Sequence, residues 1–368
     1  MKHYRYITHM ITRISSSFTI FTITVMLLTM AVNTMSYAHS GPDTSLSFPE
    51  VYTLKSFDSP EAITGYCGKE DGGTNVMWSY ENGTLTITGN GDMVNLGNDE
   101  KLIDPDIISP DMVNRIVIEN GVTNVGSFCF AKYSNLTEIS LPESVTQIGR
   151  YAFFNCTELP NVCFPDNLTA IDQFAFEGCS KLSSLELPDT LTDIGDYAFR
   201  TCTALTEVTI PENVTYIGHA AFQYCDNLQT ANILCPITGH YVFYQCQSLT
   251  DIYMNPEITH IEEGMFFGCS DLKNITLPDK LISIDMGAFK ECSKLTEITL
   301  PEHVETIGKE AFTSCFNLES VSFSDSVNSI ESHAFSTCYG LEQITLPPAL
   351  EHLSEYTFYN CTSLHTVI

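Results

Sequence analysis

The sequence predicts a repeat solenoid, a fold of stacked coils without a separate globular core. Three observations lead to this fold class. The 23-residue segment LSSLELPDTLTDIGDYAFRTCTA, Leu182 to Ala204, recurs with small changes along most of the 368-residue chain. A phenylalanine and a cysteine return at fixed places in nearly every unit. A fixed period of this size is typical of solenoids, in which each unit buries its apolar residues only against its neighbours.

Each unit opens with a pattern that predicts a short strand. In the unit that begins at Leu182, apolar residues also stand at Leu185 and Leu187. A proline follows in seven units. Because proline cannot donate to a strand ladder, the strand should end there. Stacked units then place their opening strands about 4.8 Å apart in a parallel sheet.

The second half of each unit predicts a corner, a short second strand and a short helical turn. The apolar pair Leu191 and Ile194 precedes Gly195, and Gly or Asp at this place tolerates a tight or left-handed backbone. An Ala-Phe pair comes next, and the stretch up to Cys202 has room for only one or two helical turns. The inward aromatic column is expected to consist of Phe130, Phe153, Phe176, Phe199, Phe222, Phe243, Phe266, Phe289, Phe312, Phe335 and Phe358.

Fourteen cysteines would ordinarily suggest disulfides in an exported protein. Their spacing argues against this, because side chains one unit apart project in parallel about 4.8 Å from each other, whereas bonded Cβ atoms lie about 3.8 Å apart. A straight thiol column also lacks the tetrahedral arrangement of a zinc site. We therefore expect buried, free thiols and no metal site. The column comprises Cys156, Cys179, Cys202, Cys225, Cys246, Cys269, Cys292, Cys315, Cys338 and Cys361.

The motif LxxIxLPxxVxxIGxxAFxxC, intact from Leu295 to Cys315, resembles the BspA-type leucine-rich repeat family. The resemblance covers about two-thirds of the chain. It implies a curved, right-handed solenoid with a parallel sheet on its concave face. It also implies display at the cell surface, with adhesion to host or neighbouring-cell proteins as the activity.

Residues 1–38 are predicted to be a secretory signal peptide, with an uncleaved membrane anchor as the alternative. Basic residues begin the chain, the apolar run Phe18 to Val32 follows, and Ser36-Tyr37-Ala38 offers a small-residue cleavage site. The apolar run is shorter than the roughly 20 residues of a membrane span. Residues 39–61 are polar and loosely patterned, which predicts a linker.

Residues 62–112 should form an N-terminal β cap, and residues 113–368 eleven repeats with a partial twelfth. Within the cap, the alternating segment Val76 to Gly89 surrounds Asn82-Gly83, which is a strong hairpin signal. A solenoid end exposes apolar columns and open strand edges, and such a cap covers them. The sequence shows no equivalent cap at its C-terminal end, so self-association through that edge is one hypothesis.

The composition excludes several classes of partner. The chain carries 45 acidic and 16 basic residues, a formal net charge of −29. This charge disfavours nucleic acid and anionic membrane surfaces as partners. The sequence lacks HExxH, GxSxG, P-loop and dinucleotide-binding motifs, and its histidines share no column. We therefore expect no enzyme activity, no catalytic residues and no cofactor.

The outward positions of the opening strands are the candidate binding surface. They form a polar, hydroxyl-rich ladder in which Tyr253 alone has the aromatic character of an interface anchor. The unit Leu228 to Ser248 is two residues short, which predicts a local dent with His240 and Tyr241 next to Tyr253. Simple solvated strand positions and a neutral deletion are the alternative interpretations. The candidate residues are Glu207, Thr209, Asn232, His240, Tyr241, Asp251, Tyr253, Asn274 and Glu297.

Three functions remain open at this point. The leading hypothesis is a secreted or cell-surface scaffold that binds extracellular or cell-surface proteins through the solenoid surface. The second is a structural envelope protein that associates with itself. The third, suggested by the polar ladder alone, is a glycan-binding or glycan-active protein.

Overall fold

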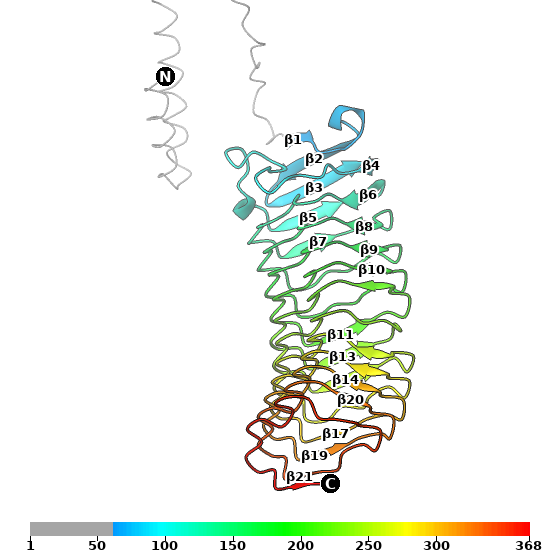
Figure 1. Ribbon diagram of the computed structural model, residues 1–368. Helices are drawn as coiled ribbons and strands as arrows, with labels where there is room; N and C mark the ends of the chain where they lie inside the picture. Colours follow the sequence, from blue (N-terminus) through cyan, green and yellow to red (C-terminus); the bar gives the residue numbers. More distant parts are fainter. Residues whose placement is uncertain (1–61) are drawn as a thin grey trace, which may run out of the picture. The chain divides into compact units, whose positions relative to one another are not determined.

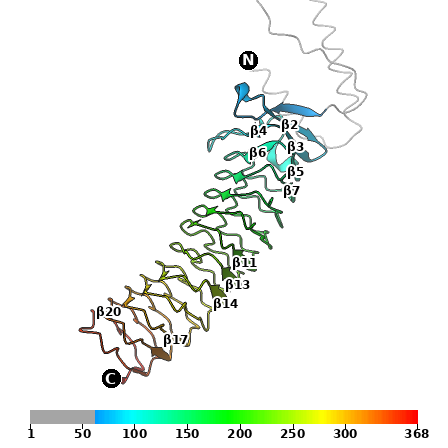
Figure 2. The same cartoon turned by 90° about the vertical axis from the view of Figure 1, so that its right-hand side faces the viewer.

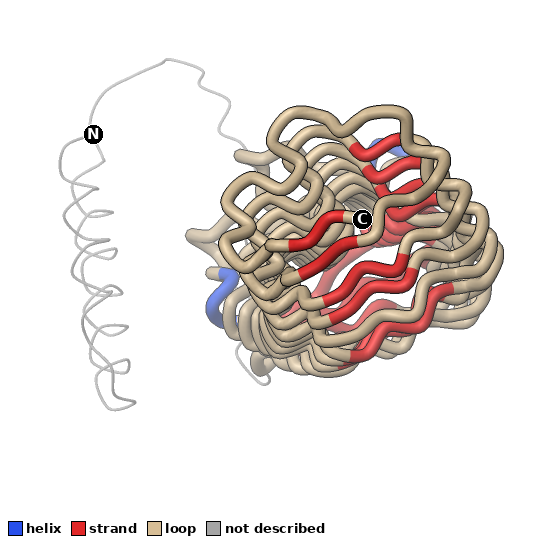
Figure 3. Tube along the Cα trace, turned by 60° about the horizontal axis from the view of Figure 1, so that its bottom comes forward, coloured by secondary structure: helices blue, strands red, loops and turns tan. Residues whose placement is uncertain are grey.

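The computed structural model describes residues 62–368, which form a solenoid of stacked coils (Figures 1 and 2). The predicted signal peptide, residues 1–38, and the predicted linker, residues 39–61, lie outside the described residues. Each coil has three sides: an opening-strand side, a second-strand side and a turn side. Figure 3 shows the strands of the first two sides as two separate rows along the stack.

The solenoid begins with an antiparallel hairpin that continues into the first coil. Asn82 and Gly83 have φ angles of 47° and 83°, the left-handed pair of a tight hairpin turn. Trp78 pairs with Ile87 across the hairpin. The second hairpin strand then pairs in parallel with the first repeat strand, so the cap supplies the edge that this strand would otherwise expose. The strands involved are β1 (Ile63–Tyr66), β2 (Val76–Glu81), β3 (Thr84–Gly89) and β5 (Arg115–Ile118).

The opening strands pair in parallel, one coil against the next, but in separate groups instead of one unbroken sheet. In the coil that begins at Leu159 only an isolated bridge from Cys163 to Glu186 forms. Pro160 occupies the position that Thr137 has in the preceding coil. The Thr137 N–H donates to the Asn114 carbonyl, whereas proline has no N–H, so the corresponding bond is missing here. The further opening strands are β7 (Glu138–Ser140), β11 (Glu207–Ile210), β13 (Thr230–Ile233), β14 (Asp251–Met254), β17 (Glu297–Thr299), β19 (Ser320–Ser322), β21 (Gln343–Ile344) and β22 (Thr366–Val367).

The predicted short second strands are present, and most of them are two residues long. They form two parallel groups, which are separated at the shortened coil Leu228 to Ser248, where no second strand forms. The second strands are β4 (Gly91–Asp92), β6 (Val122–Val125), β8 (Gln147–Ile148), β9 (Ala170–Ile171), β10 (Asp193–Ile194), β12 (Tyr216–Ile217), β15 (His260–Ile261), β16 (Ser283–Ile284), β18 (Thr306–Ile307) and β20 (Ser329–Ile330).

The prediction of short helical turns on the third side is wrong. Tyr197 and Thr201 have φ angles of 56° and 57°, and residues with a left-handed backbone cannot continue a right-handed helix. Their N–H groups and that of Phe199 donate instead to carbonyls of the next coil, over 2.8–2.9 Å. Within residues 62–368 the only helices are two short 3₁₀ segments that precede the repeats, η1 (Asp71–Gly73) and η2 (Pro110–Met112).

The glycines at the corner have a different role from the predicted one. Gly195 and Gly218 do not adopt a left-handed backbone. A Cβ atom on them would lie 2.4 Å from the backbone nitrogen of Gln173 and 2.2 Å from that of Asp196, respectively. Glycine therefore permits the close approach of adjacent coils at this corner.

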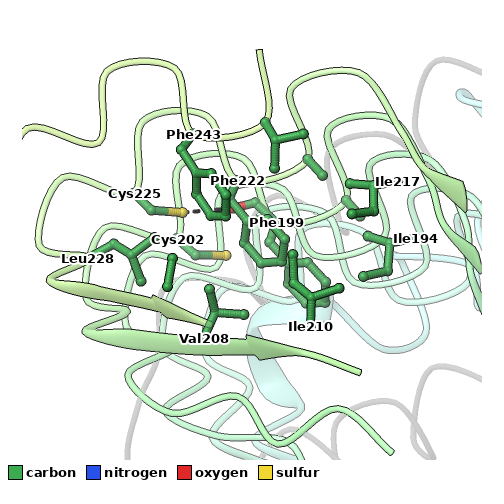
Figure 4. Close-up of a cluster of buried hydrophobic side chains, with 14 of the residues drawn as sticks. Ile194, Phe199, Cys202, Val208, Ile210, Ile217, Phe222, Cys225, Leu228 and Phe243 are labelled. Atoms are coloured by element: carbon green, nitrogen blue, oxygen red, sulfur yellow. Dashed lines mark hydrogen bonds between the residues drawn. The ribbon is translucent and has the colours of Figure 1, made fainter. Parts of the chain in front are cut away.

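The phenylalanine column lies in the interior, as predicted. Phe199 and Phe222 are fully buried, and their ring centroids lie 5.2 Å apart with planes 8° from parallel (Figure 4). The same stacking continues from Phe130 to Phe358 with centroid separations of 5.2–5.9 Å. One continuous aromatic stack thus runs through all eleven coils and couples each coil to the next.

The cysteine column is also confirmed as a row of free thiols, since all fourteen cysteines are unpaired. Each of the ten column thiols donates to the phenylalanine carbonyl of the preceding coil over 3.0–3.4 Å. Figure 4 shows this bond from Cys225 to Phe199. Burial raises the pKa of the Cys179 thiol to about 12. The Cys179 thiol therefore remains protonated in neutral solution and serves as a small apolar side chain with one weak donor.

Candidate functional site

Five of the nine candidate residues lie together on the outward face of the three-stranded group β11, β13 and β14. Thr209, Asn232 and Tyr253 face one another across the three strands in register. Glu207 and Asp251 flank Thr230 in the row beside them. The intervening side chains point into the core, as the alternation of a strand requires.

This outward face, which we call the β11–β14 face, has a fixed polar pattern around one aromatic ring. The Asn232 side-chain amide donates to the Thr209 hydroxyl over 3.2 Å. The Thr250 hydroxyl donates to the Asp251 carboxylate over 2.7 Å. Tyr253 is 50% exposed, so its ring has area left to bury against a partner. Such a ring on a rigid sheet is a suitable interface anchor.

The remaining strand-side candidates, Asn274 and Glu297, lie in the next two coils. Asn274 belongs to a coil without an opening strand and lines a shallow hollow of about 460 Å³ together with Asp251 and Lys273. Glu297 begins β17, which belongs to a separate strand group. Asn274 therefore extends the β11–β14 face, whereas Glu297 lies beyond the gap in the sheet.

His240 and Tyr241 do not join Tyr253 but belong to the turn side. The Tyr241 ring lies 5.1 Å from that of His219, and its hydroxyl donates to Glu263. Burial and then this hydrogen bond raise the pKa of Tyr241 to about 12. The His240 Nδ1 atom lies 3.8 Å from a carboxylate oxygen of Glu262. The predicted juxtaposition with Tyr253 is therefore not found.

The shortened coil does produce a dent, but a small one. It has a volume of about 190 Å³, below the roughly 300 Å³ at which small-molecule sites begin. Cys235 is buried beside it and donates to the Ile237 carbonyl over 3.3 Å. The lining residues are Pro236, Ile237, Thr238, Ile258, Thr259, His260 and Glu262.

One Ser–His–Asp group forms, although no motif in the sequence indicated a base near a serine. The Ser283 hydroxyl lies 2.8 Å from Nδ1 of His260 and donates to the Asp285 carboxylate over 2.7 Å. In a hydrolytic triad the histidine stands between serine and acid and takes the serine proton. Here serine stands in the middle, with its proton directed to the acid, so the group is not arranged for nucleophilic attack.

An outer aromatic column on the turn side was not predicted. The rings of Phe128, Tyr151, Phe174 and Tyr197 are half-buried, and successive centroids lie 4.6, 4.5 and 4.9 Å apart. All four residues have φ angles between 55° and 60°. An aromatic residue in the left-handed region is uncommon. The equivalent residue of every coil, from Phe128 to Tyr356, has this backbone, so the conformation belongs to the repeat geometry. An aromatic residue two positions before each of the first four core phenylalanines was the available sequence signal.

Residues 62–368 contain neither a metal-binding cluster nor a membrane-spanning helix. No group of three or more His, Cys, Asp or Glu side chains there is arranged to hold a metal ion. None of the helices in that range has the length and apolar character of a membrane span.

Comparison with known proteins finds repeats of one kind. The family described as BspA type leucine rich repeat region matches residues 123–238 and 236–365, with six copies. The chain is similar to the crystal structure of a leucine-rich repeat protein from Bacteroides ovatus ATCC 8483. The two are 25% identical with a TM-score of 0.57, over 80% of this chain and 86% of that one. A second similar structure, of a leucine-rich repeat protein from Eubacterium ventriosum ATCC 27560, is 19% identical with a TM-score of 0.47, over 81% and 95% of the respective chains. No curated protein matches the chain.

Proposed function

The chain belongs to the BspA-type leucine-rich repeat family, and from this premise we propose that it is a secreted or cell-surface scaffold. In this role it binds partner proteins through the solenoid surface and catalyses no reaction. Repeat solenoids present broad, rigid surfaces, which suit this kind of binding.

The β11–β14 face is the observation that carries the proposal. Its three strands hold five polar or aromatic candidate side chains in register, so little side-chain and backbone entropy is lost when a partner binds. Tyr253 supplies the large exposed ring that interface hot spots favour. Polar neighbours beside an exposed aromatic residue match the general anatomy of a protein interface.

The thiols are compatible with export into an oxidising compartment. Thirteen of the fourteen cysteines are buried, and only Cys163 is exposed. The column thiols are buried, which keeps them out of reach of oxidants, and each also donates to a backbone carbonyl. The fold therefore needs no disulfide and does not depend on a reducing environment.

The first prediction tests this face with two tyrosines of equal exposure. Tyr253 and Tyr216 are 50% and 48% exposed, but Tyr216 lies on the second-strand side. The full chain is immobilised and used to capture solubilised surface proteins of neighbouring cells. We expect Tyr253→Ala to lower the capture of specific partners at least tenfold, whereas Tyr216→Ala leaves it unchanged. Equal capture by both variants would refute the role of the β11–β14 face.

A further inference from the structure

The basic residues of this acidic protein are distributed unevenly. Residues 62–368 contain twelve Lys and Arg side chains. Eight of them form ion pairs with Asp or Glu. The four described cations without such a partner are Lys101, Lys132, Arg150 and Lys273.

Three of these four cations surround one pocket at the start of the turn side. The pocket has a volume of about 500 Å³, within the range of small-molecule sites. None of its lining residues is acidic, although the chain has 45 acidic residues. Glu100, adjacent in sequence to Lys101, is directed to the Gly97 N–H, over 2.6 Å. The lining residues are Asn98, Lys101, Phe128, Ala131, Lys132, Arg150, Tyr151 and Phe154.

Backbone hydrogen bonds between the first two coils fix the pocket walls. The Phe128 N–H donates to the Arg150 carbonyl over 2.9 Å, and the Lys132 N–H donates to the Phe154 carbonyl over 2.6 Å. Phe128 and Lys132 both have left-handed backbones, with φ angles of 59° and 66°. The strained conformation is therefore held in place by the coil ladder and directs these two side chains to the same pocket.

The other wall comes from the segment before the repeats. The Leu96 N–H donates to the Ser127 carbonyl over 3.0 Å, which ties this segment to the first coil just before Phe128. Asn98 and Lys101 follow directly and line the pocket. The pocket therefore needs both the cap region and the first two repeats.

The lining combines three kinds of chemistry. Phe128 and Tyr151 stack with centroids 4.6 Å apart, and Phe154 meets Tyr151 edge-on at 5.3 Å, which makes an apolar wall. The Arg150 guanidinium lies 5.1 Å above the Tyr151 ring and has no carboxylate partner in the described chain. The Asn98 amide and Tyr151 hydroxyl offer neutral hydrogen-bonding groups.

We propose that this pocket binds an acidic sugar, a pyranose ring that bears a carboxylate, sulfate or phosphate group. Phe128, the first ring of the outer aromatic column, receives the apolar C–H face of the sugar, because Tyr151 is stacked on both faces. The neutral groups pair with the sugar hydroxyls, and the cations bind the acid group. A compact pocket of about 500 Å³, instead of an extended groove, favours a sugar over an acidic peptide. This inference goes beyond the proposed function, because it concerns another ligand class and another side of the solenoid.

Calorimetric titration of the full chain with matched sugar pairs tests the proposal. The pairs are glucuronic acid with glucose, and N-acetylglucosamine 6-sulfate with N-acetylglucosamine. We expect at least one acidic member to bind with at least tenfold higher affinity than its neutral partner. The affinity is then measured for an oligosaccharide that ends in the same acidic residue. A higher affinity than for the monosaccharide would indicate a glycan terminus as the natural source, and a lower one a free monosaccharide.

Two variants locate the site, and a third provides the control. Arg150→Gln and Lys132→Gln should each lower the affinity at least fivefold, because each removes one unpaired cation. Lys273→Gln removes the remaining unpaired cation, which lies in the hollow beside Asp251, and should have no effect. Thermal unfolding confirms that all three variants are folded.

Several outcomes would overturn the proposal. These are equal affinity for acidic and neutral sugars, loss of affinity in Lys273→Gln alone, and no binding of any acidic sugar at millimolar concentration. Tight binding of an acidic peptide that is lost in Arg150→Gln would assign the pocket to a protein ligand instead. None of these results bears on the capture experiment with Tyr253, so the two proposals fail independently.

Discussion

The column cysteines illustrate how one residue type meets two requirements of a solenoid interior. A thiol is small enough to sit beside the stacked phenylalanines, and it can donate to a carbonyl that the ladder leaves accessible. The Phe176 carbonyl, for example, accepts both the Cys179 N–H and the Cys202 thiol. The spacing alone predicted free thiols. The carbonyl partners of the thiols could be identified only from the structure, because the carbonyls lie 24 or 26 residues earlier in the chain.

The raised thiol pKa predicts a loss of stability in alkaline solution. Burial moves the pKa of Cys179 from 9.0 to about 12, so above pH 9 the unfolded chain releases a proton that the folded chain retains. The free energy of unfolding should therefore fall between pH 9 and pH 12. In Cys179→Ala this fall should be less steep by about 1.4 kcal/mol per pH unit. Urea unfolding at several pH values measures the slope, and identical slopes for both proteins would contradict the prediction.

A second residue-scale prediction concerns the left-handed backbone on the turn side. Thr201 is β-branched and has a φ of 57°, whereas Gly178 fills the equivalent place one coil earlier. Thr201→Gly should raise the free energy of unfolding by up to about 1 kcal/mol, because it relieves this strain. Thr203→Gly, two residues away in ordinary backbone, should lower it by about 1 kcal/mol. Urea unfolding compares the two, and destabilisation by both would show that Thr201 is unstrained.

At the scale of elements, periodicity was sufficient to predict most of the strands and the inward columns, but not the turn side. The left-handed positions hold Tyr, Thr, Asn and Gln as well as Gly, so residue type did not reveal them. Short length had suggested one helical turn between Gly195 and Cys202. The actual constraint is that alternate N–H groups of this stretch, those of Tyr197, Phe199 and Thr201, donate to the next coil, which a helix would prevent.

The aromatic stack predicts a large cost for a gap in one coil. Phe199 is fully buried between Phe176 and Phe222, with centroids 5.5 and 5.2 Å away. Phe199→Ala should lower the free energy of unfolding by about 3–5 kcal/mol. Phe316→Ala is the matched control, since Phe316 is 42% exposed, and it should cost under about 1 kcal/mol. A similar loss in both variants, measured by chemical unfolding, would mean that the inner stack has no special role.

At the scale of the whole molecule, net charge and local charge act in different ways. Surface ion pairs link adjacent coils, as between Lys280 and Glu257 at 2.6 Å, but exposed pairs contribute only about 0–1 kcal/mol each. The excess acidic residues repel one another over the full surface.

The acidic-sugar pocket could not be predicted from sequence, because folding brings Lys101 together with Lys132 and Arg150. The strand-side residues could be predicted, because strand alternation places them.

The charge excess predicts that salt stabilises the fold. Added sodium chloride screens both the repulsion and the ion pairs, and the repulsion outweighs the ion pairs in a chain with a net charge of −29. The midpoint of thermal unfolding should therefore rise between about 10 mM and 500 mM salt, over which the screening length falls from about 30 Å to below 8 Å. A falling midpoint would show that the ion pairs dominate instead.

The missing second strand in the coil Leu228 to Ser248 has a mechanical consequence. When the ends of the repeat array are pulled apart, load passes from coil to coil through the interstrand bonds, and this coil carries fewer of them on one side. On the second-strand side, rupture should begin there and release lengths of chain in steps of one coil, about 76–83 Å for 23 extended residues. A force-extension trace would then show a weak first event followed by stronger, evenly spaced ones.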